Sequence, residues 1–112
     1  MPRRCFALDL KNDPQLIAEY EQHHRPGGVW PTVTADIRAE GYEGMQIWRS
    51  GTRMFMIAEV SEDFPRHRRS AETQREVDRW EALMTTFQQI LPHAPSGVRW
   101  MPMDCVFDLA DH

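Results

Sequence analysis

The feature that most constrains the fold is a pair of strand-like segments joined by a short turn. Residues 43–49 and 53–60 lie on either side of Ser50-Gly51-Thr52, and the second segment reads R-M-F-M-I-A-E-V. Apart from Glu59 this segment is almost wholly apolar, and a glycine-containing turn between two such runs is typical of a β-hairpin. The sequence therefore predicts an antiparallel hairpin near the middle of the chain.

Two helical patterns precede this hairpin. Asp13 is suited to cap a helix whose first residue is Pro14, and residues 15–24 continue it with apolar side chains at helical spacing until a Pro-Gly-Gly break. A second helix is predicted from near Pro31 to Gly41, because proline is favoured at a helix start and glycine at a helix end.

A third helical pattern follows the hairpin. Residues 61–75 are polar and basic and predict a solvated connection. Apolar side chains then recur at spacings of three and four residues, at Val77, Trp80, Met84, Phe87 and Leu91. This spacing is typical of an amphipathic helix with one face in the core. A loop is predicted at residues 92–97, where proline and glycine are frequent.

Alternating patterns near the two ends of the chain predict the outer strands. Residues 5–10 read C-F-A-L-D-L, and residues 99–109 carry Met101, Met103, Cys105 and Phe107 in alternation. The order strand, helix pair, strand, strand, helix, strand is the β-α-β-β-α-β plan of a ferredoxin-like α+β domain with an antiparallel sheet. We expect residues 1–112 to form a single domain of this kind.

Helices cover only one face of such a sheet, so its other face needs a partner. A second copy of the chain is the usual solution. We therefore expect a homodimer, whose two sheets pack together or close into a dimeric α+β barrel.

Composition and charge exclude several functional classes. The net charge is −4, from 13 basic and 17 acidic residues, so nucleic acid is not an expected partner. No apolar run is long enough to cross a membrane. Cys5 and Cys105 lie in apolar segments, and no signal peptide is expected before them, because Arg3-Arg4 leads directly into a short strand-like run. They predict two buried, reduced thiols in a cytoplasmic protein, and their spacing does not suit a metal site.

The segment with the clearest chemical potential is E-Y-E-Q-H-H-R-P-G-G-V-W-P, residues 19–31. Tyr20 and His24 are four residues apart, so they share one face of the first helix. His24 can transfer protons near neutral pH, or it can simply cap the helix end. Tyr20 can bind a substrate hydroxyl, or it can be an ordinary core tyrosine. His23 points about 100° away and is expected at the surface, and adjacent histidines make zinc binding unfavourable.

Two tryptophans and two carboxylates complete the set of candidates. Trp30 can stack on a sugar ring or hold its loop against the second helix, while Trp80 lies within an apolar helix face and is first expected in the core. Asp9 and Glu59 interrupt apolar strands, and pairing with arginine is the commoner outcome for such carboxylates. The basic run Arg66-His67-Arg68-Arg69 is assigned no role.

These motifs together resemble the L-rhamnose mutarotase family of small sugar epimerases. The resemblance spans nearly the whole chain, from R-C-F-A-L-D-L to D-C-V-F-D-L. Its most specific motif is E-Y-x-x-x-H-x-P followed by W-P, and F-M-I-A-E-V and R-W-E-A-L-M support it. The resemblance implies a dimeric α+β barrel that interconverts the α and β anomers of a 6-deoxy-hexopyranose, a monosaccharide substrate, without a metal or a cofactor.

The resemblance also implies roles for individual residues. His24 matches the proton donor of the family, while Tyr20 and Trp80 match substrate-binding residues. For Trp80 the resemblance therefore replaces the first expectation of core packing with an expected sugar contact. Glu81 replaces a second tryptophan, and Met45 replaces a substrate-binding tyrosine. With the longer H-R-P-G-G-V-W-P loop, these departures resemble the branch that acts on L-fucose, with L-rhamnose as the next choice. Glu81 and Trp30 are additional candidates for sugar contacts.

Two other functions share this predicted architecture. Small monooxygenases and haem-binding proteins also form dimeric α+β barrels, so the fold alone does not decide between them and a mutarotase. A non-catalytic sugar-binding module is the third possibility. Spectra, oxygen uptake and anomer-exchange rates discriminate among the three.

Overall fold

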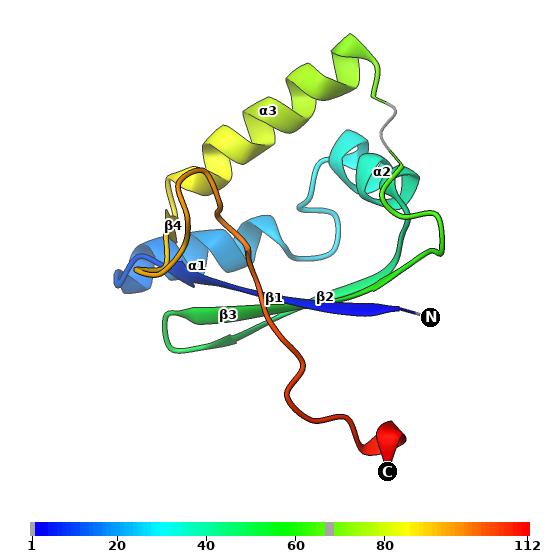
Figure 1. Cartoon of the computed structure of the whole chain (residues 1–112). Helices are drawn as coiled ribbons and strands as arrows, with labels where there is room; N and C mark the ends of the chain where they lie inside the picture. The colour runs from blue at the N-terminus through cyan, green and yellow to red at the C-terminus, as the bar shows by residue number, and fades with distance from the viewer. Residues whose placement is uncertain (1, 67–68) are drawn as a thin grey trace.

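The computed structural model describes residues 2–66 and 69–112 and contains one antiparallel sheet with helices on one side (Figure 1). The strands are β1 (Arg3–Leu10), β2 (Tyr42–Ser50), β3 (Arg53–Val60), β4 (Gln88–Gln89) and β5 (Met101–Pro102). The helices are α1 (Pro14–His23), α2 (Pro31–Glu40) and α3 (Ala71–Thr85), followed by a 3₁₀ turn, η1 (Leu109–Asp111). The predicted ferredoxin-like α+β fold is confirmed in its main elements.

The sheet has the strand order β2-β3-β1-β4, and β5 also pairs with β1. All these pairs are antiparallel, as the ferredoxin-like plan predicted for the sheet. In the central pair, Phe6 lies opposite Met56 and Leu8 opposite Met54. Because directly opposed residues share a sheet face, these side chains form a common apolar surface beneath the helices.

The helix boundaries agree with the capping signals. The Asp13 carboxylate accepts hydrogen bonds from the backbone N–H groups of Gln15 and Leu16 at the start of α1. Gly41 ends α2 with a φ of 113°, a left-handed conformation that glycine adopts readily. Sequence-level capping therefore placed the first two helices correctly.

The core lies between the helices and the sheet. Its buried members come from β1, α1, α2, β3, α3 and the segment after α3, and they include Leu8, Leu10, Tyr20, Val33, Met54, Trp80, Met84 and Phe87. Burial of these apolar side chains holds α1 and α3 against the sheet. The helices carry the candidate residues, so the same packing positions the site.

The third helix is shorter than its apolar pattern predicts. It ends at Thr85, yet Phe87 and Leu91 beyond it are buried as expected. Between them Gln88–Gln89 forms β4 and pairs with Asp9 and Leu10 of β1. The helical spacing therefore predicted correctly which side chains are buried, but it did not predict the backbone conformation. The backbone amides of Gln88–Gln89 pair with β1 and do not continue the helix.

The predicted last strand, residues 99–109, is wrong for most of its length. Only Met101–Pro102 is a strand, and the Met103 N–H extends the pairing by donating to the Cys5 carbonyl. In this register Cys105 would lie opposite Arg3, where β1 begins. The alternating residues beyond that point have no strand to pair with, so the chain leaves the sheet.

The cysteines and the strand carboxylates test two further expectations. Cys5 and Cys105 are free thiols, but Cys5 is half-buried and Cys105 is exposed, so the predicted burial of both is wrong. Cys105 lies in the segment that leaves the sheet, which accounts for its exposure.

Asp9 and Glu59 pair with Arg53 and Arg3, respectively, as expected for carboxylates in apolar strands.

The sheet face opposite the helices carries an apolar strip. Cys5 lies opposite Ile57, and Phe55 lies opposite both Ala7 and Trp48, so all of these side chains share that face. The C-terminal segment leaves the body on this same side of the sheet (Figure 1). Across the described ranges, no helix is long and apolar enough to cross a membrane.

Candidate active site

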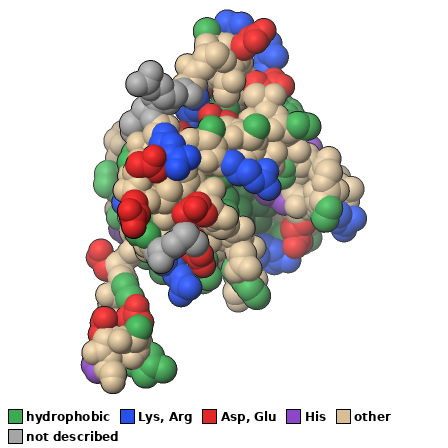
Figure 2. Space-filling view, turned by 90° about the vertical axis from the view of Figure 1, so that its right-hand side faces the viewer, with side chains coloured by type: hydrophobic (Ala, Val, Ile, Leu, Met, Phe, Trp, Pro, Cys, Tyr) green, Lys and Arg blue, Asp and Glu red, His purple; other side chains and the backbone are tan. Residues whose placement is uncertain are grey.

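A cavity of about 590 Å³ lies between the helices and the sheet. Its lining combines residues from the end of α1, from α2, from β2 and from α3, among them Tyr20, His24, Met45, Trp80, Glu81 and Gln88. Figure 2 shows the molecular face at the right of Figure 1, where the surface is hollowed and hydrophobic side chains lie within the hollow. Four of the five predicted site residues therefore meet at one cavity, although they come from distant parts of the chain.

His24 lies immediately after α1 and is held by its own helix. Its Nδ1 atom is 2.7 Å from the Tyr20 carbonyl oxygen. A carbonyl oxygen can only accept a hydrogen bond, so Nδ1 carries the hydrogen and Nε2 is the basic atom of the neutral ring. This fixed tautomer leaves Nε2 to accept or return a proton at the cavity that His24 lines.

Burial lowers the pKa of His24 below its ordinary value of 6.5, and the nearby charge of His23 lowers it further. The hydrogen bond to the Tyr20 carbonyl opposes this shift only in part. His24 is therefore neutral at pH 7 and able to act as a base, which suits general acid–base chemistry better than a permanently charged ring would.

The Pro-Gly-Gly break shapes the backbone behind His24. Gly27 has a φ of 83°, and a Cβ on Gly28 would lie 2.7 Å from the His23 carbonyl oxygen. Glycine is thus needed at both positions, once for the left-handed backbone and once for the close approach to the helix end. The loop can therefore turn directly behind α1 toward Trp30 and α2.

Tyr20 lies beside His24, with ring centroids 4.3 Å apart. Its side chain is only 4% exposed, and its hydroxyl oxygen is 3.5 Å from Nε2 of Gln88. Burial raises the pKa of Tyr20 above 10, and the charge of Glu81 adds to this, while Gln88 and Arg99 act in the opposite direction. The phenol is therefore protonated at neutral pH and remains a hydrogen-bond donor.

Trp80 is 6% exposed in the core and also lines the cavity. The core packing that its helix spacing first predicted is thus present, and its place at the cavity is compatible with the sugar contact that the resemblance implies. Its ring lies 5.7 Å from that of His24 and 5.2 Å from that of Trp30. Trp30 packs on the edge of Trp80 and is not among the cavity-lining residues. His23 is half-buried against Trp80 and Phe87, so its expected surface position is wrong.

Glu81 lines the cavity but is already engaged. One of its carboxylate oxygens accepts a 2.9 Å bond from Nη2 of Arg99. Arg99 also donates to the side-chain oxygen of Gln88 from Nε at 3.1 Å and from Nη2 at 2.8 Å. Sequence reasoning missed Gln88 and Arg99, since Gln88 lay within a predicted helix and neither residue belongs to a recognisable motif.

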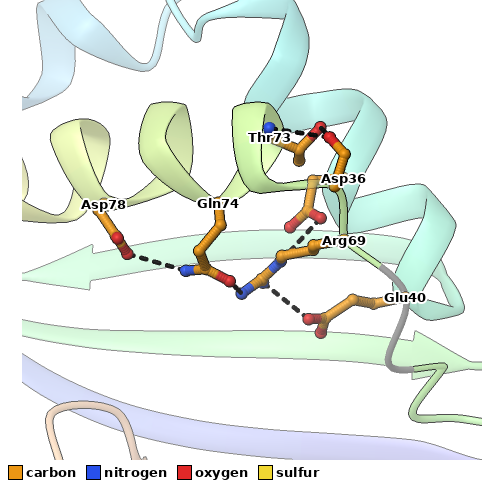
Figure 3. Close-up of polar contacts among 7 residues, drawn as sticks. Asp36, Glu40, Arg69, Thr73, Gln74 and Asp78 are labelled. Carbon is orange, nitrogen blue, oxygen red and sulfur yellow. Dashed lines mark hydrogen bonds and ion pairs between the residues drawn. The ribbon is translucent and has the colours of Figure 1, made fainter.

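An ion-pair cluster of Arg69, Asp36 and Glu40, drawn in Figure 3, also lines the cavity. Arg69 donates from Nε to Asp36 at 2.9 Å and from Nη2 to Glu40 at 2.7 Å, joining the segment before α3 to α2. Gln74 bridges Arg69 and Asp78. Arg69, the last residue of the basic run 66–69, thus pairs with carboxylates of α2, which the sequence did not indicate. His67 and Arg68 lie outside the described residues.

Within residues 2–66 and 69–112, no group of three or more His, Cys, Asp or Glu side chains is arranged to hold a metal ion. The cavity is lined by, among others, an imidazole, a phenol, an indole and an amide, contributed by His24, Tyr20, Trp80 and Gln88. Aromatic side chains together with a few polar groups are typical of small-molecule binding sites.

Comparison with known proteins identifies the family. The sequence profile described as L-rhamnose mutarotase matches residues 3–109. An L-fucose mutarotase of Xanthomonas campestris pv. campestris is 39% identical over 113 residues, which cover 99% of this chain and 90% of that protein. The chain therefore belongs to the L-rhamnose mutarotase family, a family of carbohydrate isomerases.

A solved structure supports the fold independently. The crystal structure of an L-rhamnose mutarotase from Formosa agariphila has a TM-score of 0.66 and covers 97% of this chain and 99% of its own. The sequence identity is 22%, so this likeness concerns the fold alone. It confirms the ferredoxin-like architecture that the element order predicted.

Proposed function

We propose that this protein is a mutarotase that interconverts the α and β anomers of a 6-deoxy-hexopyranose, with L-fucose as the preferred sugar and L-rhamnose next. The observation that carries the proposal is the fixed tautomer of His24, whose Nε2 is available at a cavity also lined by Tyr20 and Trp80. A cavity of about 590 Å³ is of the size that accepts small molecules.

The chemistry requires one proton to be taken and another to be given. A base removes the proton of the anomeric hydroxyl, and an acid protonates the ring oxygen as the ring bond breaks to give the open-chain aldehyde. Rotation of the carbonyl group and closure in the reverse sense give the other anomer. Neutral His24 serves as the proton carrier, and Tyr20 binds a sugar oxygen through its phenol hydrogen. Trp80 offers an apolar ring face to the sugar.

The preference for L-fucose rests on the relative and on two residues of the cavity. The relative with 39% identity is named an L-fucose mutarotase. Glu81 and Met45 both line the cavity, at the positions where the sequence departs from the rhamnose-type pattern. Glu81 offers hydrogen-bond acceptors to sugar hydroxyls, whereas an indole at that position would offer a stacking surface. Trp30 supports the site from behind by fixing Trp80.

Exchange NMR tests this proposal directly. Saturation of one anomeric proton of L-fucose or L-rhamnose should transfer to the other anomer faster when protein is present. His24→Ala should lose this acceleration, while the matched control His93→Ala, at an exposed loop histidine, should keep it. Unchanged anomer exchange with both sugars would refute the mutarotase proposal, and full activity of His24→Ala would remove His24 from the mechanism.

Two alternatives predict different results. A monooxygenase or haem-binding protein of the same fold would show haem absorbance or substrate-dependent oxygen uptake. A non-catalytic sugar-binding module would bind L-fucose saturably without changing anomer exchange. The family membership and the histidine at the cavity favour the mutarotase over both.

We also propose that the protein is a homodimer formed through the sheet face opposite the helices. Support comes from the apolar strip on that face, where Trp48 is 60% exposed, and from the C-terminal segment, where Val106 and Phe107 are 96% and 66% exposed. Water-exposed apolar residues gathered in this way favour a second copy as cover. Analytical ultracentrifugation should give a dimer for the wild type, a monomer for Trp48→Asp, and a dimer for the control Ala18→Asp on α1. A monomeric wild type would refute this assembly.

The proposed location is the cytoplasm. Cys5 and Cys105 are both free thiols, which supports a reducing compartment. Cell fractionation with an antibody to the chain tests this, and recovery outside the cytoplasmic fraction would overturn it.

A further inference from the structure

Four side chains form a continuous chain of hydrogen bonds beside the cavity. Arg99 donates to the Glu81 carboxylate at 2.9 Å and, from two of its nitrogens, to the Gln88 side-chain oxygen at 3.1 and 2.8 Å. The Gln88 amide nitrogen is in turn 3.5 Å from the Tyr20 hydroxyl oxygen, at the long end of hydrogen-bond distances. Glu81, Gln88 and Tyr20 line the cavity, and Arg99 joins them from behind.

The chemistry of the guanidinium group fixes the direction of every bond in this chain. A guanidinium group only donates, so the atom of Gln88 that faces Arg99 must be the amide oxygen. The amide NH₂ group of Gln88 therefore faces Tyr20 and donates to its hydroxyl oxygen. Because Gln88 is buried, water cannot easily replace Arg99 as the group that selects this orientation.

This direction determines what the phenol of Tyr20 can do. A hydroxyl group that accepts a bond from Gln88 still has its own hydrogen to donate. Within residues 2–66 and 69–112 that hydrogen has no acceptor, and the Tyr20 side chain lines the cavity. If the amide were reversed, its oxygen would attract the phenol hydrogen away from a ligand.

We propose that Arg99 is a positioning residue that, through Gln88, fixes Tyr20 as a hydrogen-bond donor to a sugar oxygen in the cavity. The inference rests on the proposed mutarotase function and extends it to two residues that no motif marks. It explains why a buried amide, and not an apolar side chain, lies next to the phenol. It also assigns the Glu81 carboxylate a second task, since its bond to Arg99 helps to hold the guanidinium group in place.

The most direct test is Gln88→Glu, which preserves the shape of the side chain and its bonds to Arg99. It removes the donor that faces Tyr20, so the phenol donates to the new carboxylate instead of to the sugar. Loss of such a bond should lower kcat/KM for anomer exchange by roughly 10- to 100-fold. Tyr20→Phe should show a similar loss, and the double variant should be no worse than the poorer single one. The matched control Gln89→Glu, at the exposed neighbour on β4, should keep wild-type activity.

Arg99 variants keep the proposal testable if Gln88→Glu fails to fold. Arg99→Met releases the Gln88 amide and should lower kcat/KM by about 10-fold. Arg99→Lys still donates a bond to Gln88 and should recover part of the loss. Wild-type rates in folded Gln88→Glu or Arg99→Met would overturn the proposal.

A spectroscopic readout on the sugar-free protein separates this inference from the proposed function. The chain has two tyrosines, so Tyr42→Phe leaves Tyr20 as the only one. The tyrosine doublet in the Raman spectrum distinguishes a phenol that accepts a hydrogen bond from one that donates strongly. In the Tyr42→Phe background the spectrum should show an accepting phenol, and added Gln88→Glu should change it to a donating one. An unchanged doublet would refute the fixed bond direction, whereas absent anomer exchange in the wild type would refute the mutarotase function alone.

Discussion

Replacing His24 by asparagine or by glutamine separates the two nitrogen atoms of its ring. An asparagine amide reaches the position of Nδ1 and can still donate to the Tyr20 carbonyl, which Nδ1 contacts at 2.7 Å. A glutamine amide reaches the position of Nε2 and can still form a hydrogen bond with a sugar. Neither amide can carry a proton at neutral pH, so both variants remove acid–base chemistry while each preserves a different bond.

The structure gives the size of both effects. A positioned acid or base contributes about 10²- to 10⁴-fold to rate, so we expect both variants to lose activity by this factor. The His24 ring lies 4.3 Å from that of Tyr20 and 5.7 Å from that of Trp80. Aromatic pairs contribute about 0.5–1.5 kcal/mol each, so His24→Asn should lower the free energy of unfolding by about 1–3 kcal/mol. His24→Ala also loses the bond to the carbonyl and should cost about 0.5–1.5 kcal/mol more.

Exchange NMR with L-fucose measures the rates, after subtraction of the uncatalysed exchange, and urea titration measures the stabilities. The decisive comparison is His24→Gln against the wild type under conditions where both are folded. A rate for His24→Gln within about tenfold of the wild type would refute the reasoning, because hydrogen bonding at Nε2 would then account for a catalytic effect assigned to proton transfer.

Three further predictions concern pH, the indole and the ion-pair cluster. Because burial lowers the His24 pKa below 6.5, a pH–rate profile of kcat/KM should have an acidic limb with an apparent pKa below 6.5, and a limb centred above 6.5 would contradict this. The stability contributed by neutral His24 should be lost as pH falls through 6.5 toward the folded-state pKa, because the unfolded chain takes up the proton first. Trp80→Ala should lower the free energy of unfolding by about 3–5 kcal/mol in urea titration and should remove most of the anomer-exchange activity measured by NMR. Trp80→Phe should lower both quantities by less. Arg69→Met leaves buried Asp36 without its partner and should lower the free energy of unfolding by about 1–3 kcal/mol. Added Asp36→Asn should partly reverse this loss, because it removes the unpaired charge. Full stability of Arg69→Met would show that the pair contributes nothing.

Local signals in the sequence were sufficient for most of the fold. Asp13 followed by Pro14 placed the start of α1, and Gly41 placed the end of α2, because capping depends on neighbouring residues alone. The hairpin of β2 and β3 was predicted for the same reason, since a short glycine turn sets the pairing of the strands beside it. Predictions that depended on a distant partner were less successful.

The segment after α3 and the C-terminal strand show why. Phe87 carries the apolar spacing of the helix, but pairing of Gln88 with β1 ends the helical backbone. The alternation of residues 99–109 is real, yet the observed pairing ends at Met103, and β1 itself begins at Arg3, opposite Cys105, so residues 106–109 have no partner strand. A sequence pattern shows which side chains favour burial, whereas the length of a partner strand becomes visible only in the folded chain.

The candidate site shows the same difference between what local sequence patterns predict and what only the folded chain shows. The sequence by itself determined that Tyr20 and His24 share a helix face, because the helical repeat fixes that relation. Only the tertiary structure decided which ring nitrogen of His24 is free, that Gln88 adjoins Tyr20, and that Arg99 adjoins Gln88. The bond between Gln88 and Tyr20 joins residues 68 positions apart, and its effect depends on the direction of the hydrogen bond. No local pattern encodes such directions, because they arise when separate elements pack around one cavity.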